Sequence, residues 1–396
     1  MTQLVRTLLH VFSTLEIGGP QIRFAQLANH FGRKYRHVIL AMDGVTDALA
    51  LIADDVDVRL IEAPVRRGHG VGAAVENVRR FHGILRAVRP ELLITANWGA
   101  MEWALANLER RVAHLHLEDG FGPDEAFRQI PRRVWARRLL LRRSAVLVPS
   151  QTLYRIARDT WRLPERRLLY VPNGVDCDRF GIPYDREFAA AVGIRAGIPV
   201  IGTVAGLRSE KNLGRLLDAF ALIARERAMQ LVIVGDGPER GELTARAERL
   251  GVQQSVIMTG ACAAPERLLP RFDVYAVSSD TEQMPLSVLE ALAAGRPLAA
   301  TDVGDIRAMV DPENHPFLVA RDTVALAGAM RALIEKPDAA AAIGAANARR
   351  ARMVFDKRFM FAAYERLFDG QLPDRQSWDQ SPAHAHVPGG SSSNTG

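Results

Sequence analysis

The chain has 396 residues, of which 48% are hydrophobic and 24% are charged, and its formal net charge is +6. This composition excludes a disordered or collagenous chain, and the length is sufficient for two domains of ordinary size. No apolar stretch reaches the roughly 18 residues of a membrane span, and the apolar run at the start is too short for a secretion signal, so we expect a cytoplasmic protein.

Short β-rich runs alternate with helical patterns through the first half of the chain. The predicted strands are at 6–12, 37–42, 57–63, 91–96, 111–117, 145–149 and 168–172. One intervening helix is legible at 21–31, where apolar residues recur at helical spacing. Such alternation indicates a parallel sheet with crossover helices on both faces.

A second series of the same kind follows a turn-rich stretch at 172–185. Its predicted strands are at 198–207, 231–237, 255–260, 273–279 and 296–304, and helical patterns follow at 338–352 and 356–368. The sequence therefore predicts two similar α/β domains joined near 175–195. Residues 371–396 are rich in Pro, Ser and Gly and are expected to be disordered.

Cysteine content and charge distribution narrow the function classes. Cys177 and Cys262 are the two cysteines and lie far apart, so a disulfide framework or a zinc site is not indicated. Residues 1–175 hold 26 basic and 17 acidic side chains, whereas the remainder holds 25 and 28. A basic first half suits an anionic partner such as a membrane surface, a phosphorylated lipid or nucleic acid, or is simply a solvated arginine-rich surface.

Two glycine turns follow predicted strands. Gly18 and Gly19 come after the first strand and precede a helix, and Gly235 and Gly237 stand in the sequence GDGP. Such turns at the carboxyl ends of strands can present backbone N–H groups to an anion, or can be plain tight turns.

A third turn carries two cations. Arg208 and Lys211 stand in TVAGLRSEKN, just before a helix whose N-terminus itself favours negative charge. The pair would suit a diphosphate, and an exposed polar turn is the alternative.

Two carboxylates form the strongest local signal. Glu282 lies at a strand-to-helix turn, and Glu290 follows eight residues later among apolar side chains. A partly buried carboxylate requires partners, which either a structural arginine or the vicinal hydroxyls of a ligand such as a ribose could supply.

At this point the residues match a family pattern. The segment SDTEQMPLSVLEALAAG resembles the S-x-x-E-G-x-P-x-x-x-x-E-A-x-A-x-G signature of glycosyltransferase family 4, whose members have the GT-B fold. The GG turn, VPNGVDCDRF, the S-E-K-N loop, VGDGPER and IMTG support the resemblance in the same order along the chain.

The resemblance implies a domain plan. It implies two Rossmann-like domains facing each other across a cleft, an acceptor domain at 1–175 and a nucleotide-sugar donor domain at 176–355. The helix at 356–370 would pack back on the first domain, ahead of the tail at 371–396.

The resemblance also implies roles in the donor domain. Glu290 would bind the ribose of a nucleotide, Lys211 the diphosphate, and Glu282 the transferred sugar. The segment after Glu282 would assist through its backbone N–H groups, and comprises Gln283, Met284, Pro285 and Leu286. Gly18, Gly19, Gly235 and Gly237 would line the same nucleotide-sugar site.

Two positions depart from the family pattern. Gly206 stands where the family usually has an arginine, so Arg208 would have to supply that cation from another direction. Gln283 replaces the glycine that commonly follows the first glutamate, which changes the sugar contacts and keeps both carboxylates.

In the first domain the family often has a histidine after the strand near 111–117. His116 is the preferred catalytic candidate, with a satisfied core histidine as the alternative. Asp119 is the rival, because a loop carboxylate there could meet the acceptor hydroxyl or merely cap the turn.

The arginine-rich segment at 127–143 has two interpretations. A basic helix can contact an anionic membrane surface, or it can be an ordinary charged helix. Its arginine pairs recur every five residues and should drift around the helix, which favours the ordinary helix. Nucleic-acid binding is not indicated, because aromatic residues are sparse and no recognition motif is visible.

The resemblance implies transfer of a sugar from a nucleoside diphosphate sugar, UDP- or GDP-linked, to an acceptor hydroxyl with retention of configuration. The acceptor would be a glycan or a lipid-linked sugar in bacterial cell-surface polysaccharide or lipopolysaccharide synthesis, with peripheral contact at the inner membrane. Fixed cations would replace a metal, so no metal or other cofactor is expected. The alternatives are an inactive nucleotide-sugar-binding subunit, or another enzyme of the same fold such as a nucleotide-sugar epimerase or a phosphorylase.

Overall fold

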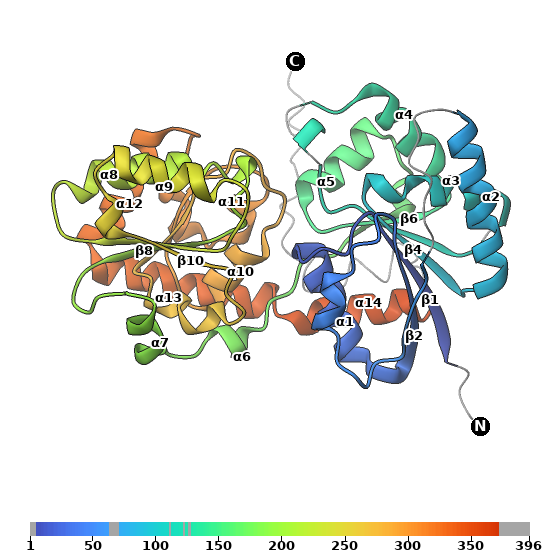
Figure 1. Ribbon diagram of the computed structural model, residues 1–396, viewed down its shortest axis with the longest axis horizontal. Helices are drawn as coiled ribbons and strands as arrows, with labels where there is room; N and C mark the ends of the chain where they lie inside the picture. The colour runs from blue at the N-terminus through green and yellow to red at the C-terminus, as the bar shows by residue number, and fades with distance from the viewer. Residues whose placement is uncertain (1–4, 63–70, 111, 122, 126–127, 372–396) are drawn as a thin grey trace, which may run out of the picture.

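The computed structural model describes residues 5–62, 71–110, 112–121, 123–125 and 128–371. Within these ranges the chain forms two parallel sheets, each covered by helices on both faces (Figure 1). This confirms the predicted GT-B-type α/β architecture. Apart from Gln371, the tail expected to be disordered lies outside the described residues.

The first sheet has the order β3-β2-β1-β4-β5-β6-β7 in the described part of the chain. Its strands are β1 (Arg6–Phe12), β2 (Tyr35–Ala41), β3 (Val58–Leu60), β4 (Leu92–Ala96), β5 (His114–Leu117), β6 (Ala145–Val148) and β7 (Leu168–Tyr170). All its pairings are parallel, and its central strands are apolar on both sides because helices cover both faces. The strand predicted at 111–117 begins only at His114.

The helices of the first domain are α1 (Gly19–Phe31), α2 (Val71–Val88), α3 (Met101–Arg110), α4 (Pro131–Leu140) and α5 (Gln151–Arg155), and a π-helical turn over Ile156–Thr160 continues α5. α1 packs on one face of the sheet, whereas α2 and α3 pack on the other. Pro20 in the first turn starts α1, and Gly32, with φ of +52°, ends it.

The second sheet has the order β10-β9-β8-β11-β12-β13 among the described residues. Its strands are β8 (Val200–Val204), β9 (Gln230–Val234), β10 (Val256–Gly260), β11 (Val274–Val277), β12 (Leu298–Thr301) and β13 (Leu318–Val319). The two-residue β13 had no sequence signal of its own, since it is too short for a periodic pattern.

Helices cover both faces of the second sheet as well. They are α6 (Cys177–Phe180), α7 (Arg186–Ala191), α8 (Leu213–Ala224), α9 (Arg240–Arg249), α10 (Leu286–Ala293), α11 (Ile306–Met309), α12 (Thr323–Glu335) and α13 (Pro337–Val354). α8, α9 and α12 share one apolar core, and α10 packs in another on the opposite face. No helix in the described residues is long and apolar enough to cross a membrane.

The chain passes between the domains twice, at one place. Val175 donates its N–H to the carbonyl of Phe355 (2.8 Å), and Lys357 donates to the carbonyl of Val175 (2.9 Å). The two crossings touch so closely that a Cβ on Gly174 would lie 2.6 Å from the Cα of Lys357. The outgoing and returning segments therefore run side by side.

After the second crossing, α14 (Lys357–Phe368) returns to the first domain. It lies beside α1 (Figure 1), and Met360, Phe361, Tyr364 and Phe368 belong to the same apolar core as β1, β4 and α1. Phe368 is 2% exposed and packs edge-on against Phe31 and Tyr35. The last helix thus completes the core of the first domain.

We expect Phe368→Ala to lower the free energy of unfolding by about 3–5 kcal/mol, because it leaves a cavity between α14 and the first sheet. Phe359→Ala, on the 36% exposed side of the same helix, is the matched control and should cost far less. Chemical denaturation measures both, and equal losses would show that α14 is not anchored through Phe368.

Candidate functional site

Four loops meet at the carboxyl edge of the second sheet. They follow β8, β9, β11 and β12 and span 205–212, 235–239, 278–285 and 302–305. In open parallel α/β sheets this is the edge where ligands bind. The donor-site residues expected from the sequence, apart from those at the first glycine turn and on α10, lie in the first three of these loops.

Lys211 and Glu282 come together as an ion pair. The Nζ of Lys211 lies 2.6 Å from Oε1 of Glu282, and the hydroxyl of Ser279 donates to the same oxygen at 2.7 Å. Both side chains are largely buried, so the pair sits in a medium where charges interact more strongly than in bulk water. The structure therefore holds the predicted diphosphate-binding cation against the predicted sugar-binding carboxylate.

Polar contacts that were not predicted from the sequence hold the loops at 205–212 and 278–285 together. Asp280 accepts hydrogen bonds from Asn212 (2.9 Å) and Arg215 (2.6 Å), and Arg215 also donates to the carbonyl of Ser278 (2.7 Å). Asn212 has φ of +43° and caps α8 by accepting from the N–H of Arg215. Asp280 lies only two residues before Glu282 in the sequence, and this proximity is the feature that could have marked Asp280 as a site residue.

Gly235 and Gly237 have a packing reason to be glycine. Their φ values are +139° and +158°, and a Cβ on them would lie 1.9 Å from the Ala205 carbonyl oxygen and 2.6 Å from that of Leu207. Only a residue without a side chain allows this turn to approach the loop after β8. The turn therefore supports the loop that carries Arg208 and Lys211.

Arg208 folds back over Gly206. A Cβ on Gly206 would lie 3.3 Å from Nε of Arg208 and 3.7 Å from its Nη2. The guanidinium is 60% exposed and pairs with Glu210 at 3.2 Å. A cation thus stands beside position 206, although residue 206 itself carries none.

Glu290 lies on α10 and is half-buried. Its surroundings raise the pKa of its carboxyl to about 7, chiefly through loss of hydration, while the Arg179 cation opposes the rise and Glu266 adds to it. Arg179 donates its guanidinium to Glu266 (2.9 Å) instead. Within the described residues the Glu290 carboxyl forms no hydrogen bond or ion pair, so it is available to a hydrogen-bond donor from outside the chain.

The first domain approaches this edge at two glycines. A Cβ on Gly19, the first residue of α1 after Gly18, would lie 3.8 Å from Cδ1 of Leu286. A Cβ on Gly120, with φ of +147°, would lie 3.1 Å from Cγ of Gln283. The first glycine turn therefore faces the segment Gln283, Met284, Pro285 and Leu286.

His116 is fully buried in β5. Its Nδ1 lies 2.8 Å from the hydroxyl of Thr95, and its Nε2 lies 3.5 Å from Oε2 of Glu118. Arg137 donates to that same oxygen at 3.2 Å. The structure places the imidazole inside the domain, with no surface open to a substrate in this conformation.

Asp119 is held in a two-point ion pair. The Nη1 and Nη2 atoms of Arg23 lie 2.5 and 2.9 Å from its two carboxylate oxygens, and Arg23 is only 3% exposed. Arg23 also donates to the Oδ1 of Asn173 (2.9 Å), whose Nδ2 donates to the carbonyl of Met284 (2.9 Å). Asp119 is thus linked, through the side chains of Arg23 and Asn173, to the segment beside Glu282.

A second polar joint fixes the two domains. Asp305, only 4% exposed, accepts hydrogen bonds from the N–H groups of Gln151 (2.5 Å) and Thr152 (3.0 Å) and from the Thr152 hydroxyl (2.7 Å). Ser150, at the start of the same helix, donates to Oε1 of Gln283 (3.1 Å). No local pattern marks Asp305 or Asn173 as joining residues, because their partners lie more than a hundred residues away in sequence.

Gly304 brings this joint to the site. Its φ is +58°, and a Cβ there would lie 2.1 Å from the carbonyl oxygen of Glu282. Asp305 also donates its N–H to the carbonyl of Gln283 (3.0 Å). The residues that carry the candidate carboxylate and the residues that hold the first domain are therefore in contact.

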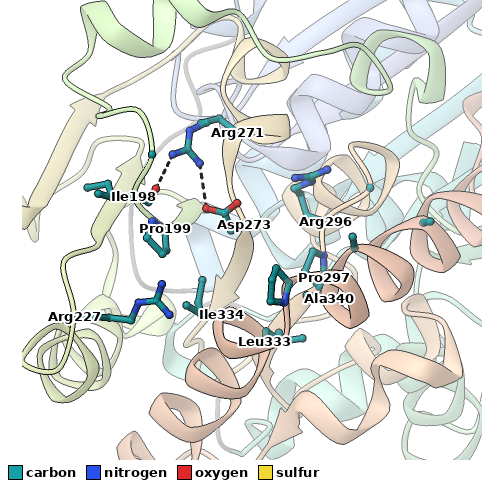
Figure 2. Close-up of a pocket in the computed structure, with 15 residues that line it drawn as sticks. Ile198, Pro199, Arg227, Arg271, Asp273, Arg296, Pro297, Leu333, Ile334 and Ala340 are labelled. Atoms are coloured by element: carbon teal, nitrogen blue, oxygen red, sulfur yellow. Dashed lines mark hydrogen bonds and ion pairs between the residues drawn. The ribbon is translucent and has the colours of Figure 1, made fainter.

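A cavity of about 600 Å³ lies at the opposite, amino edge of the second sheet (Figure 2). Two arginines in its wall serve the fold: Arg271 donates to the Ile198 carbonyl (2.7 Å) and to Asp273 (3.1 Å), and Arg296 donates to the carbonyl of Phe272 (2.9 Å). None of the site residues expected from the sequence lines this cavity.

Two family models match the chain. Residues 17–179 match the one described as Glycosyltransferase Family 4, and residues 198–336 match Glycosyl transferases group 1. The two matches fall on the first and the second sheet with their helices.

Curated relatives are similar over part of the chain. The alpha-monoglucosyldiacylglycerol synthase of Streptococcus pneumoniae is 28% identical over 201 residues, which cover 49% of this chain and 45% of the relative. The putative glycosyltransferase EpsF of Bacillus subtilis is 29% identical over 236 residues, covering 58% and 60%. The chain thus matches about half the length of these relatives.

Solved structures share the fold over nearly the whole chain. A glycosyltransferase from Rickettsia africae superposes with a TM-score of 0.79 at 16% identity, covering 94% of this chain and all of that one. The Anabaena protein HepE, solved with UDP and glucose, gives 0.78 at 18%, covering 92% and 100%. WaaG, a glycosyltransferase involved in lipopolysaccharide biosynthesis, gives 0.73 at 17%, covering 92% and 100%. At such identities the likeness establishes the fold.

The raised pKa of Glu290 predicts a pH-dependent stability. The folded protein keeps a proton on Glu290 up to about pH 7, whereas the unfolded chain releases it near pH 4.5, so this residue lowers stability as the pH rises through that window. Glu290→Gln should therefore be the more stable protein at pH 8, by up to about 3 kcal/mol, and should match the wild type at pH 4. Denaturation at both pH values tests this, with Glu187→Gln as an exposed control; parallel pH profiles would contradict it.

Proposed function

The chain belongs to glycosyltransferase family 4 and has the GT-B fold, and from this premise we propose that it transfers a sugar from a nucleoside diphosphate sugar to an acceptor hydroxyl with retention of configuration. One observation carries the proposal. Lys211 and Glu282 form a largely buried ion pair at the carboxyl edge of the second sheet, beside segments that contact the first domain.

The ion pair suggests how the donor enters. The diphosphate of the donor would take Lys211 as its counter-ion, since a sugar-linked diphosphate carries two negative charges whereas the Glu282 carboxylate carries one. Glu282 would then be free to accept hydrogen bonds from the hydroxyls of the transferred sugar. Ser279, which already donates to Glu282, would keep the carboxylate in place during this exchange.

Arg208 would supply the second cation. Its guanidinium lies beside Gly206 and is mostly exposed, so it can swing toward a diphosphate by changing side-chain torsions alone. Breaking the bond to the sugar places negative charge on the departing diphosphate, and one well-placed donor at such a charge contributes roughly 3 kcal/mol to the lowering of the barrier. Fixed cations would thus do the work that a metal ion does elsewhere.

Glu290 would bind the ribose. It has no partner among the described residues, and two ribose hydroxyls could donate to its two oxygens. Those hydrogen bonds favour the ionised carboxyl and would lower its pKa. Binding near pH 7 would therefore release a proton from the protein.

The acceptor would meet the donor from the first domain. His116 is enclosed and Asp119 is neutralised by Arg23, so neither offers a free base in this conformation. We therefore assign the acceptor's proton to an oxygen of the donor phosphate, with Asp119 and Arg23 shaping the acceptor side. The names of the similar proteins, a glycolipid synthase and a lipopolysaccharide glycosyltransferase, favour a cell-surface glycan or lipid-linked acceptor.

Calorimetric titration with UDP, GDP and ADP tests the donor site. One diphosphate should bind the wild type with micromolar affinity, and Lys211→Ala and Glu290→Ala should each weaken it at least tenfold, about 1.4 kcal/mol. Lys336→Ala is an exposed control that should bind as the wild type does. Binding that survives both site variants unchanged would overturn the site.

Measurement of enzymatic turnover distinguishes sugar transfer from donor binding alone. With the sugar conjugate of the diphosphate that binds, Glu282→Gln should keep diphosphate affinity within a few fold and lose roughly 100-fold in kcat, whereas Lys211→Ala should lose both. Excess EDTA should leave the wild-type rate unchanged. If the protein binds the donor but neither transfers the sugar to an acceptor nor hydrolyses the donor, it is an inactive binding subunit instead.

A further inference from the structure

The order of strands in the first sheet reverses between β1 and β4. From this point the chain continues outward through β2 on one side and through β5 on the other. In open α/β sheets, ligands bind beside the carboxyl ends of the strands at such a reversal. The loops that follow β1 and β4 touch there, since a Cβ on Gly99 would lie 2.1 Å from the Oγ of Ser13. A substrate of the first domain is therefore expected beside these two loops.

Asn97 directly follows β4 and has a backbone conformation that suits glycine. Its φ is +58° and its ψ is −177°, a region that residues with a side chain rarely adopt. Its N–H donates to the carbonyl of Leu117 (2.8 Å), and its Oδ1 accepts from the N–H of Asp119 (2.8 Å). The neighbouring strand and loop thus hold Asn97 in a strained conformation. Residues of this kind cluster at active sites and ligand-binding sites.

The amide nitrogen of Asn97 has no partner among the described residues. Oδ1 is engaged by Asp119, which orients the amide, whereas Nδ2 forms no hydrogen bond there. The side chain is half-buried. Glycine would adopt this backbone conformation without strain, but it would lack the two N–H donors of the amide. The side chain therefore offers an oriented donor that the described part of the fold does not use.

The loop that Asn97 holds is a contact between the two domains. Asp119, whose N–H is bound by Asn97, is followed by Gly120. A Cβ on Gly120 would lie 3.1 Å from Cγ of Gln283, the residue after the candidate sugar-binding carboxylate of Glu282. Asn97 thus stands on the first-domain side of the place where donor and acceptor would meet.

We propose that Asn97 binds the acceptor by donating from Nδ2 to a hydroxyl oxygen beside the hydroxyl that reacts. The inference rests on the proposed function, because it presumes sugar transfer to a hydroxyl. It adds the class of the acceptor, which is a molecule with at least two neighbouring hydroxyls, as in a sugar ring, and not a simple alcohol. A site that binds a substrate hydroxyl discriminates against a compound without it, because the donor of the site is then left unpaired.

Acceptor probes test this class. The donor is the sugar conjugate of the diphosphate that binds. The probes are the octyl glycosides of glucose, galactose, mannose and N-acetylglucosamine, with 1-octanol as the comparison that has a single hydroxyl. The wild type should use at least one glycoside with a kcat/KM roughly a hundredfold or more above that for 1-octanol. Equal use of 1-octanol would overturn the proposal.

Asn97→Asp removes the donor and keeps an acceptor oxygen for the N–H of Asp119. The KM for the glycoside that the wild type uses should rise roughly tenfold with little change in kcat, because the lost hydrogen bond is made to the ground state and the transition state alike. Hydrolysis of the donor by water and affinity for the diphosphate should stay as in the wild type, since neither involves the acceptor. A KM equal to that of the wild type would show that Nδ2 does not bind the acceptor.

Asn97→Gly distinguishes the lost donor from the added charge of the aspartate. Because glycine adopts this φ without strain, the variant should unfold within a few degrees of the wild type, and it should raise the KM as Asn97→Asp does. If Asn97→Gly keeps the wild-type KM, the aspartate acts through its charge and the assignment to Nδ2 fails. If both variants unfold far below the wild type, Asn97 serves the fold alone and the proposal fails as well.

Asn107 provides the matched control at the amino end of β5. It is buried on α3, and its amide exchanges two hydrogen bonds with Val112, at 2.8 and 3.0 Å. Asn107→Asp should lower the unfolding temperature and leave the KM for the glycoside unchanged. A rise in KM equal to that of Asn97→Asp would mean that lost stability, and not a lost contact, accounts for both.

Two further outcomes distinguish a failure of this inference from a failure of the proposed function. If the wild type hydrolyses the donor but transfers sugar to none of the glycosides, the acceptor class is wrong while the donor site stands. If the wild type neither transfers nor hydrolyses, the proposed function itself fails, and the role of Asn97 fails with it.

Discussion

The carboxylate of Asp305 holds the two domains in the relation on which the site depends. It reaches from the second domain to the first turn of α5, where it accepts three hydrogen bonds, two of them from backbone N–H groups that the helix cannot satisfy itself. The preceding residue, Gly304, packs so closely on Glu282 that a Cβ there would lie 2.1 Å from the Glu282 carbonyl oxygen. A displacement of one domain relative to the other would therefore shift the backbone at Glu282, the candidate sugar-binding residue.

Burial of charge explains the contrast between the two carboxylates of the site. Glu282 has Lys211 and Ser279 as partners, so its negative charge is compensated in a partly buried place. Glu290 has none among the described residues, and its carboxyl holds a proton more readily as a result. The Glu282 carboxylate is thus paired within the protein, whereas the Glu290 carboxyl is unpaired within the described residues. A ligand that carries both a diphosphate and a diol could bind Lys211 through the diphosphate and Glu290 through the diol.

The sequence predicted most of the fold because parallel strands are apolar runs that local patterns reveal, as in β1 and β9. It also placed Lys211 and Glu282 at neighbouring turns. It could not find Asp305 or Asn173, whose partners are distant in sequence, or β13, which is two residues long. For α4, spacing predicted arginines on more than one side of the helix, as the structure has them, but it could not show that Arg137 is buried, because the aromatic rings and acidic residues around Arg137 come from elsewhere in the domain.

The paired crossings at Val175 and Lys357 constrain how the domains can move. Because the outgoing and returning segments are hydrogen-bonded to each other, they act as one two-stranded hinge and resist both twisting and stretching. Opening or closing must then be a rotation about an axis through this hinge. Residues near the axis barely shift, and the largest excursions fall on loops farthest from Gly174.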